Sequence, residues 1–518
     1  MSNRFKEFAL NHLGDFILPR IYRHHVETLR NSQLRQEQVF QQLKQRLAGT
    51  LLAQEIQINR YSTFKEFIRH FPAQPYAFYE PYVKRVMEGE PNVMYRDATE
   101  YFLVTSGTSG FNNKIIPCNS SLRKVIAKTQ QKALATIFPE CRGLVLTSDR
   151  FAYGSRSNAE TIRGIPKDYI SGIVPFLIPK MLREYVVPSS ETQKEPDWTS
   201  KVRRMAQETR HRDIRGIFGL PAYLLHVLSD LVKEWRISSL REIWPNLELC
   251  AYSGTSVHPY RHSLNQLAGV NLKFFGAYVS TESPLGFEMP ALTDQPEHMC
   301  FLPDLVLYSF QDLNGKNSTP LTLDELKIGG TYLVNLGTPN GIVHYSIRDY
   351  IRVSQTTPFV QFELMGRYGA AMNVAAEKVS EIEIEKAVNV LQKILSIQIQ
   401  HYFVFPSEEA SDRPAYEWIF ATDTSLPSES LSEQIDKALM CISADYKEAR
   451  QQTNVLAPPI VRTIPSHCTQ NLADRLQGSG QFKLPHAFLD KQAFLTFSKT
   501  YLDSKNHMII DRLRPHST

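Results

Sequence analysis

The chain has 518 residues, which is too many for one hydrophobic core and predicts two or more domains. Hydrophobic residues make up 42% and charged residues 21%, a globular composition that excludes a disordered or fibrous protein. The net charge of +5 is too small for this length to indicate nucleic-acid binding, although its sign would suit an anionic ligand.

The six cysteines form no C-x-x-C pair and no zinc-type spacing, which predicts free thiols in a reducing compartment. The N-terminus has no continuous apolar segment of the kind that a secretory signal needs. No stretch approaches the roughly 20 apolar residues of a membrane span. We therefore expect a cytoplasmic protein with neither nucleic acid nor membrane among its partners.

Helices are predicted first along the chain. Apolar residues recur at steps of three to five between Ile21 and Leu52 and predict an amphipathic helix packed on the main body. Prolines interrupt Phe64–Glu90, which predicts short helices separated by breaks.

From Tyr101 onward, strand-like runs alternate with helical ones, which predicts an α/β fold with buried parallel strands. The expected strands include Glu100–Ser106, Gly143–Ser148, Leu247–Gly254, Asn271–Ser280 and Thr331–Gly337. The expected helices include Ser120–Phe138, Pro221–Trp235 and Pro259–Gly269.

Two further features predict how the chain is divided. Between Met299 and Val353 the strands follow one another closely, which predicts a small antiparallel or barrel-like subdomain. Gly366–Gly369 breaks the pattern, and the rest of the chain has helices and strands of its own. We predict an N-terminal domain over residues 1–367, a boundary at about 366–370, and a smaller α/β domain over residues 368–518.

The segment TSGTSGFNNK, Thr105–Lys114, could be a phosphate-binding loop or an ordinary turn between two strands. Glycines let the backbone N–H groups approach a ligand, hydroxyls add donors, and Lys114 could neutralise phosphate charge. A helix that followed directly would add its N-terminal dipole, and Asn119 and Ser120 could cap it. The spacing excludes a Walker loop and a G-x-S-x-G nucleophile elbow. Composition alone leaves both interpretations open.

Three other stretches have residue types suited to a nucleotide. Tyr278 could stack on a base, and Glu282 could bind magnesium through a hard carboxylate oxygen. Asp349 could accept hydrogen bonds from ribose hydroxyls, and Lys483 lies in a loop bounded by glycine and proline. Each of these residues also has a simpler interpretation. Tyr278 could be a core residue and Glu282 a solvated one. Asp349 could pair with a neighbouring arginine, and Lys483 could be a solubilising surface lysine.

In this order, these stretches resemble the auxin-responsive family of acyl acid–amido synthetases, which are acyl-adenylate-forming enzymes. Thr105–Lys114 is similar to the family motif S-S-G-T-S/T-x-G-x-x-K, and Tyr278–Glu282 to Y-A-S-S-E. The segment YSGTSVHPYRHSLNQLAG is similar to the part of the family that lies along the adenine. The segments GRYGAAMNVAAEKVSE and GSGQFKLP are similar to the hinge and to the C-terminal lysine motif. The resemblance covers about residues 25–490.

The third family motif shows departures. Gly341–Val353 aligns without gaps on G-L-Y-R-Y-R-V-G-D-V-L-R-V, and Asp349 and Arg352 match. Ser346 replaces an arginine of the motif, and Arg348 replaces its glycine.

The resemblance implies an AMP-forming ligase that uses ATP and magnesium, adenylates a carboxylic acid, and passes the acyl group to an amine, usually of an amino acid. Its small-molecule partners would be those two substrates. The C-terminal domain would rotate about a hinge at Arg367 between the half-reactions and carry Lys483 toward the α-phosphate or the bound adenylate. The resemblance implies Lys483, Lys114 and Glu282 as catalytic residues, with Glu282 on magnesium. The implied nucleotide-binding residues are Ser106, Gly107, Thr108, Ser109, Gly254, Thr255, Tyr278, Ser280, Thr281, Asp349, Arg352 and Arg367.

Three alternatives remain open, and one of them is an α/β scaffold unrelated to the family. The adenylate could be passed to a thiol, such as coenzyme A or a carrier protein. The replacements at Ser346 and Arg348 also allow a nucleotide-binding interaction module that has lost catalysis.

Overall fold

The computed structural model describes residues 3–105, 114–141, 143–154, 160–195, 197–254, 257, 260–292, 297–313, 319–368, 370–375, 377–407, 413–423, 426–469, 486–488 and 490–501. These residues form two compact units, one within Met1–Thr105 and Lys114–Tyr368 and the other within Gly369–Thr518. In the described residues, no helix is long and apolar enough to cross a membrane.

The first unit begins with helices. The predicted helical segment between Ile21 and Leu52 comprises the end of a longer helix and two further ones, because the chain breaks at Asn31 and again before Thr50, whose hydroxyl caps the third helix. The short helices expected around the prolines are confirmed. The bounds are α1 (Asn3–Arg30), α2 (Ser32–Leu47), α3 (Leu51–Glu55), α4 (Phe64–His70) and α5 (Tyr76–Met87).

The main sheet of this unit has eleven described strands in the order β12-β13-β14-β15-β11-β10-β9-β8-β7-β3-β6. The five from β6 to β9 run parallel, and β10 to β12 continue the sheet in antiparallel fashion. This confirms the predicted α/β class and its antiparallel portion. The bounds are β3 (Asp149–Tyr153), β6 (Val186–Val187), β7 (Ile214–Gly219), β8 (Leu249–Ser253), β9 (Lys273–Val279), β10 (Pro284–Glu288), β11 (His298–Phe301), β12 (Leu307–Asp312), β13 (Thr331–Gly337), β14 (Tyr345–Gln355) and β15 (Gln361–Arg367).

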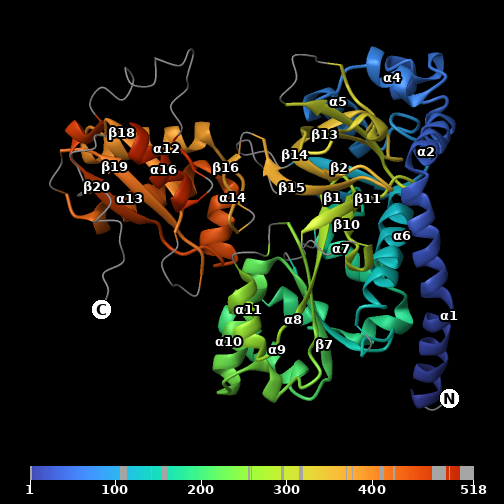
Figure 1. Cartoon of the computed structure of the whole chain (residues 1–518), viewed down its shortest axis with the longest axis horizontal. Coiled ribbons are helices and arrows are strands. Elements are labelled where there is room, and N and C mark those ends of the chain that lie inside the picture. The colour runs from blue at the N-terminus through green and yellow to red at the C-terminus, as the bar shows by residue number, and fades with distance from the viewer. Residues whose placement is uncertain are drawn as a thin grey trace. The chain divides into compact units, whose positions relative to one another are not determined.

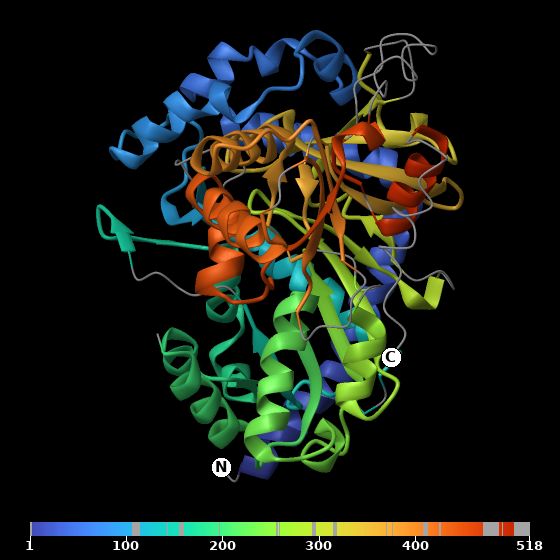
Figure 2. The same ribbon diagram turned by 90° about the vertical axis from the view of Figure 1, so that its left-hand side faces the viewer.

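Helices cover the parallel half of the sheet. They are α9 (Trp198–Thr209), α10 (Pro221–Trp235) and α11 (Arg261–Ala268), and Figure 2 shows α10 and α11, in green, in front of the parallel strands. The strand predicted at Gly143–Ser148 is wrong. This segment is a turn in which the Ser148 hydroxyl accepts from the Val145 N–H at 2.8 Å, and the buried Arg150 guanidinium donates to the carbonyls of Val145 and Leu146.

The antiparallel half of the sheet is curled. Strands β9 and β14 stand four places apart, which is about 19 Å in a flat sheet. Nevertheless the Tyr278 hydroxyl on β9 donates to Asp349 Oδ2 on β14 at 2.9 Å. Aromatic rings fill the inside of the curl, including the stacked pair Phe301 and Phe362, 4.1 Å apart. Gly286 on β10 allows close packing there, because a Cβ atom would lie 2.5 Å from the Cys300 carbonyl oxygen.

A second, four-stranded sheet of this unit has the order β2-β1-β5-β4. Strands β1 (Thr99–Val104) and β2 (Ile115–Asn119) form an antiparallel hairpin, and β1 runs parallel to β5 (Ile165–Asp168), which pairs with β4 (Glu160–Ile162). Helix α6 (Ser120–Ile137) follows β2 and packs along α1, as Figure 1 shows. Helix α7 (Ile170–Leu177) follows β5.

The second unit has its own three-stranded sheet, β18-β19-β20, with a core of phenylalanines. Its strands are β16 (Ala370–Met372), β17 (Val379–Ser380), β18 (His401–Pro406), β19 (Tyr416–Ala421) and β20 (Ile460–Ile464). Its helices are α12 (Glu381–Leu395), α13 (Ser428–Ile442), α14 (Ala444–Lys447) and α16 (Lys491–Tyr501).

Candidate active site

The loop singled out in the sequence lies at the tip of the β1–β2 hairpin. Its base is closed by two hydrogen bonds: the Thr105 N–H donates to the Lys114 carbonyl at 3.0 Å, and the Lys114 N–H donates to the Thr105 hydroxyl at 3.2 Å. Ser106, Gly107, Thr108 and Ser109 lie outside the described residues. The described part of the segment is therefore the base of a connection between two strands, which is compatible with both interpretations.

The helix predicted to follow this loop is present as α6, but it does not follow directly. Strand β2 intervenes, so α6 begins at the opposite end of that strand from the loop. The predicted cap itself is present, since Asn119 Oδ1 accepts from the Leu122 N–H at 2.9 Å. A phosphate bound beside Lys114 would therefore lie a strand's length away from the α6 N-terminus, and the helix dipole acts only near its own first turn.

The Lys114 ammonium lies between two tyrosines. Its Nζ is 3.4 Å from the Tyr345 hydroxyl, 5.5 Å from the Tyr76 ring centroid and 6.0 Å from the Tyr345 ring centroid. Tyr76 is held in turn by Ile115, whose carbonyl accepts from its hydroxyl at 2.9 Å. Burial raises the pKa of Tyr76 to about 12, and the nearby Glu282 charge contributes, so the phenol keeps its proton. Lys114 thus has a cation–π site that holds its side chain beside β14.

Sequence reasoning missed Tyr76. The signal was present in the proline- and tyrosine-rich segment QPYAFYEP, which precedes the loop by about 30 residues. A prediction of its role would have required knowing that α5 begins there and that its first turn packs on β2.

The turn between β9 and β10 holds Ser280, Thr281 and Glu282. Ser280 makes its hydrogen bonds within the turn: its N–H and its hydroxyl both donate to the Ser283 carbonyl, at 3.0 and 3.1 Å. Glu282 is 6% exposed, and among the described residues its carboxylate has no hydrogen bond or ion pair. A carboxylate this buried normally has a cationic or hydrogen-bonding partner, so the position suits a bound cation.

Tyr278 is a core residue in this structure. Its side chain is 2% exposed, and its ring meets the Phe362 ring edge-on at 6.1 Å between centroids. Burial, with the charge of Asp349 and the hydrogen bond to it, raises the pKa of Tyr278 well above its usual value, so its hydroxyl remains a donor. Stacking of adenine on this ring, as predicted, would require the ring to leave the core. The contact present is with Asp349.

Asp349 lies at an irregularity of β14. The register with β13 shifts between Leu333 and Asn335, and the register with β15 shifts next to Tyr350. Arg348 has a left-handed backbone, with φ at 64°. Bulges of this kind re-aim a side chain next to a site. The positive φ also explains why a glycine is favourable at the position where this chain has arginine.

The other predicted residues are placed as follows. Arg352 is exposed on β14, and Arg367 ends β15 opposite Asp349 in the strand register. Gly254 follows β8 with φ at 86°, a backbone that glycine tolerates best. Thr255 and Lys483 lie outside the described residues.

The second unit begins with a loop organised by a carboxylate that sequence reasoning did not single out. Glu377 is 1% exposed and accepts from the N–H groups of Val374 and Ala375, at 2.8 and 2.7 Å, and from the Tyr416 hydroxyl. Three donors hold it in place, although burial raises its pKa.

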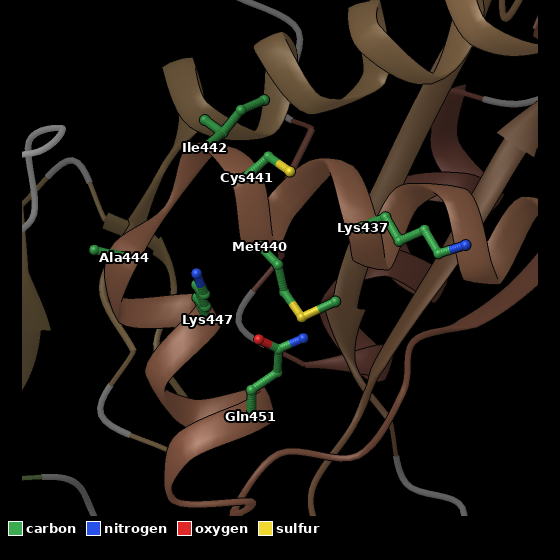
Figure 3. Close-up of a pocket in the computed structure, with 7 residues that line it drawn as sticks. All are labelled: Lys437, Met440, Cys441, Ile442, Ala444, Lys447 and Gln451. Carbon is green, nitrogen blue, oxygen red and sulfur yellow. The ribbon is translucent and has the colours of Figure 1, made fainter.

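A surface cavity of about 450 Å³ also lies in this unit, along α13 and α14 (Figure 3). Its lining includes Lys447, Cys441 and Met440, and none of the predicted site residues.

The comparisons with known proteins agree with these motifs. The model of the GH3 family N-terminal domain matches residues 23–203, and that of the GH3 family C-terminal domain matches residues 382–492. The chain is 23% identical over 262 residues to jasmonoyl–L-amino acid synthetase JAR4 of Nicotiana attenuata, which is 47% of this chain and 44% of that protein. It is 23% identical over 305 residues to indole-3-acetic acid-amido synthetase GH3.10 of Arabidopsis thaliana, 53% of this chain and 49% of that protein. The chain thus spans about half the length of the curated relatives it matches.

Solved structures share the fold over nearly the whole chain. The AtGH3.15 acyl acid amido synthetase in complex with 2,4-DB has a TM-score of 0.60 at 16% identity and covers 93% of this chain and 96% of its own. A 2-hydroxyisobutyryl-CoA ligase with 2-HIB-AMP and CoA has a TM-score of 0.57 at 12% identity, with 92% of each chain covered. The two family models together match more than half of the residues, which confirms the resemblance in the sequence: the chain belongs to the GH3 family.

Proposed function

We propose that this chain is an ATP-dependent acyl acid–amido synthetase. In the first half-reaction, a carboxylate oxygen of the acid attacks the α-phosphorus of ATP, and pyrophosphate leaves. In the second, the nitrogen of an amine attacks the acyl carbon, AMP leaves, and the nitrogen loses its proton. The proposed amine belongs to an amino acid, as in the names of the relatives.

The observation that carries the proposal is the convergence of three separate motifs on β14. Lys114 reaches Tyr345 on this strand from 231 residues away, and Tyr278 reaches Asp349 on it from 71 residues away. Glu282 lies close enough to influence the pKa values of both Tyr76 and Tyr278. The base of a glycine-rich loop, a cation, a buried carboxylate and a ribose-type acceptor therefore meet in one region of one unit.

In this proposal each group acts on a different part of ATP. Ser106, Gly107, Thr108 and Ser109 hold the β- and γ-phosphates together with Lys114, whose charge offsets that of the departing pyrophosphate. Asp349 accepts from the ribose hydroxyls, and the Tyr278 hydroxyl holds that carboxylate in place. The remaining contacts to the nucleoside come from the β8 and β9 ends and from β14: Gly254, Thr255, Ser280, Thr281 and Arg352.

Magnesium fits Glu282. The carboxylate supplies the hard oxygen that Mg²⁺ prefers, and it is buried without a partner among the described residues. The described part of the chain contains no group of three or more His, Cys, Asp or Glu side chains that could hold a metal ion by itself. A single carboxylate suffices, because magnesium in nucleotide sites takes most of its ligands from phosphates and water. The ion would supply charge neutralisation on the triphosphate.

We further propose that residues 368–518 form a mobile domain that turns about residues 366–370, with Arg367 at the hinge. Lys483, carried by this domain, would serve the adenylation half-reaction. The three hydrogen bonds to the Glu377 carboxylate would keep the first loop of that domain rigid while the hinge moves, because all three donors lie C-terminal to residue 369. The six free cysteines support a reducing compartment, and we place the protein in the cytoplasm.

Carboxylate-dependent exchange of label between pyrophosphate and ATP tests the first half-reaction. Asp349→Ala and Lys114→Ala should nearly abolish exchange. Lys84→Ala, which changes an exposed lysine paired with Glu80, should leave it unchanged. Lys483→Ala should slow exchange far more than it weakens ATP binding. Near wild-type exchange in both Asp349→Ala and Lys114→Ala would refute the site.

An ATP-to-AMP assay over a matrix of acids and acceptors, with products identified by mass, tests the second half-reaction. We expect amides. Thioesters formed with coenzyme A would instead place the chain among thiol ligases, and ATP binding without AMP formation across the matrix would identify a non-catalytic module.

A further inference from the structure

Two positions of β14 depart from the third family motif in opposite directions. The motif has arginine at position 346 and glycine at position 348, whereas this chain has Ser346 and Arg348. The arginine that is missing at the first position is therefore matched by one two residues later. Two residues of a strand span about 7 Å, which is comparable to the length of an arginine side chain. A guanidinium from either position can therefore reach the same bound group.

Arginine at position 348 has a conformational cost. Its φ is 64°, in the left-handed region that disfavours every residue except glycine. The strand is distorted at this point, because the three residues 347–349 stand opposite the single residue Val334 of β13. Backbone strain of this kind is found most often at ligand sites, where the surrounding structure fixes it. A role for the Arg348 side chain would account for an arginine where glycine fits the backbone better.

The Arg348 side chain is available to a ligand. It is exposed, and among the described residues it makes no hydrogen bond or ion pair. Its backbone is fixed, because the Tyr368 N–H donates to the Arg348 carbonyl at 2.7 Å. The adjacent Asp349 carboxylate accepts from a tyrosine hydroxyl. Arg352, by contrast, stands opposite Glu363 in the strand register, so a carboxylate lies next to it. Of these two arginines, Arg348 is the one better suited to an external anion.

The position proposed for the ribose decides which anion this is. If Asp349 accepts from the ribose hydroxyls, the α-phosphate is the nearest phosphate, because it is attached to the same ribose. The β- and γ-phosphates would lie farther away, beside Lys114. A guanidinium suits the α-phosphate, since its planar fork donates two parallel hydrogen bonds to phosphate oxygens. It would also offset the charge that develops there when the acid attacks.

We propose that Arg348 binds the α-phosphate of ATP and of the acyl-adenylate, and that it makes up for the arginine missing at position 346. This inference rests on the proposed function, and it adds a phosphate-binding residue that belongs to this chain and not to the family motif. Its distinguishing consequence concerns AMP and adenosine. Both ligands have the ribose, but only AMP has the α-phosphate.

Isothermal titration calorimetry with AMP and with adenosine tests the contact without requiring turnover. Arg348→Gly should weaken AMP binding at least about tenfold, as expected for the loss of a charge-assisted hydrogen bond, and should leave adenosine binding unchanged. Arg236→Gly is the matched control. Arg236 is also exposed and also has a left-handed backbone, with φ at 56° at the end of α10, so its replacement relieves similar strain. This control should change neither affinity, whereas Asp349→Ala should weaken both.

The double variant Ser346→Arg, Arg348→Gly tests the exchange of positions. It restores the residues of the family motif and should recover most of the AMP affinity that Arg348→Gly loses. Lack of recovery would refute the exchange. Unchanged AMP affinity in Arg348→Gly, or an equal loss of AMP and adenosine, would overturn the phosphate contact. In either case a wild-type chain that still catalyses pyrophosphate exchange would keep the proposed function. A wild-type chain that binds neither ligand and catalyses no exchange would refute both.

Discussion

Tyr278→Phe separates two roles for the tyrosine of the second motif. The substitution keeps the ring and removes only the hydroxyl that donates to Asp349 at 2.9 Å. If the ring acts by stacking, the variant should behave like the wild type. If the hydroxyl positions Asp349, the carboxylate loses a hydrogen bond worth about 1.5–3 kcal/mol. At about 1.4 kcal/mol per tenfold, this is a loss of roughly 10- to 100-fold in kcat/KM for ATP.

Pyrophosphate exchange at varied ATP and saturating acid measures that loss, which we expect mainly in KM for ATP. Tyr308→Phe is the matched control. Tyr308 is also fully buried, and its hydroxyl donates to the Leu285 carbonyl at 2.7 Å and accepts from the Leu302 N–H at 3.2 Å, without contact to Asp349. Both variants should lose stability, Tyr308→Phe also because it leaves the Leu302 N–H without its acceptor, and only Tyr278→Phe should lose affinity for ATP. An unchanged KM in Tyr278→Phe, or an equal rise in both variants, would refute the positioning role.

Three further predictions concern stability. Arg348→Gly should raise the free energy of unfolding by up to about 1 kcal/mol, because relief of the left-handed backbone at φ 64° exceeds the entropy that glycine loses; a lower denaturation midpoint would argue against this. Asp304→Asn should cost about 3–5 kcal/mol in urea unfolding, because it leaves the buried Lys132 ammonium without its carboxylate, whereas the double variant Lys132→Met, Asp304→Leu should cost much less. Burial raises the pKa of Asp445 from 3.8 to about 7. The folded state therefore keeps a proton that the unfolded chain releases, and stability falls as the pH rises from about 4 to about 7. Asp445→Asn should flatten that dependence in thermal melts, and an unchanged slope would contradict the assignment.

Much of the local structure could be predicted from the sequence, because it depends on nearby residues. Asn119 was recognisable as a cap because a short polar side chain precedes a run of helical periodicity, and it caps α6. The strand at Asn271–Ser280 was visible as an apolar run ending in polar residues, and β9 lies there. The family could likewise be identified from the sequence, because glycine, hydroxyl, carboxylate and lysine residues occur in the same order as in the family motifs.

The structural features that could not be predicted depend on contacts between residues that are not neighbours in the sequence. Gly143–Ser148 is apolar enough for a strand, but the turn is held by Arg150, whose guanidinium reaches back to its carbonyls. The burial of Tyr278 follows from the curl of the sheet, which no local pattern reveals.

The curl of the main sheet also determines at which stage of folding the proposed site can form. The antiparallel strands β10, β11 and β15 all stand between Tyr278 and Asp349, and each must pair in its own register before the two side chains meet. A slip of one residue in any of them would turn side chains to the wrong face. Partly folded chains can therefore contain every motif and still lack the proposed nucleotide site. A nucleotide bound at this site would stabilise only the chain with the completed sheet. By mass action, the ligand would therefore shift the folding equilibrium from the intermediates toward the native state.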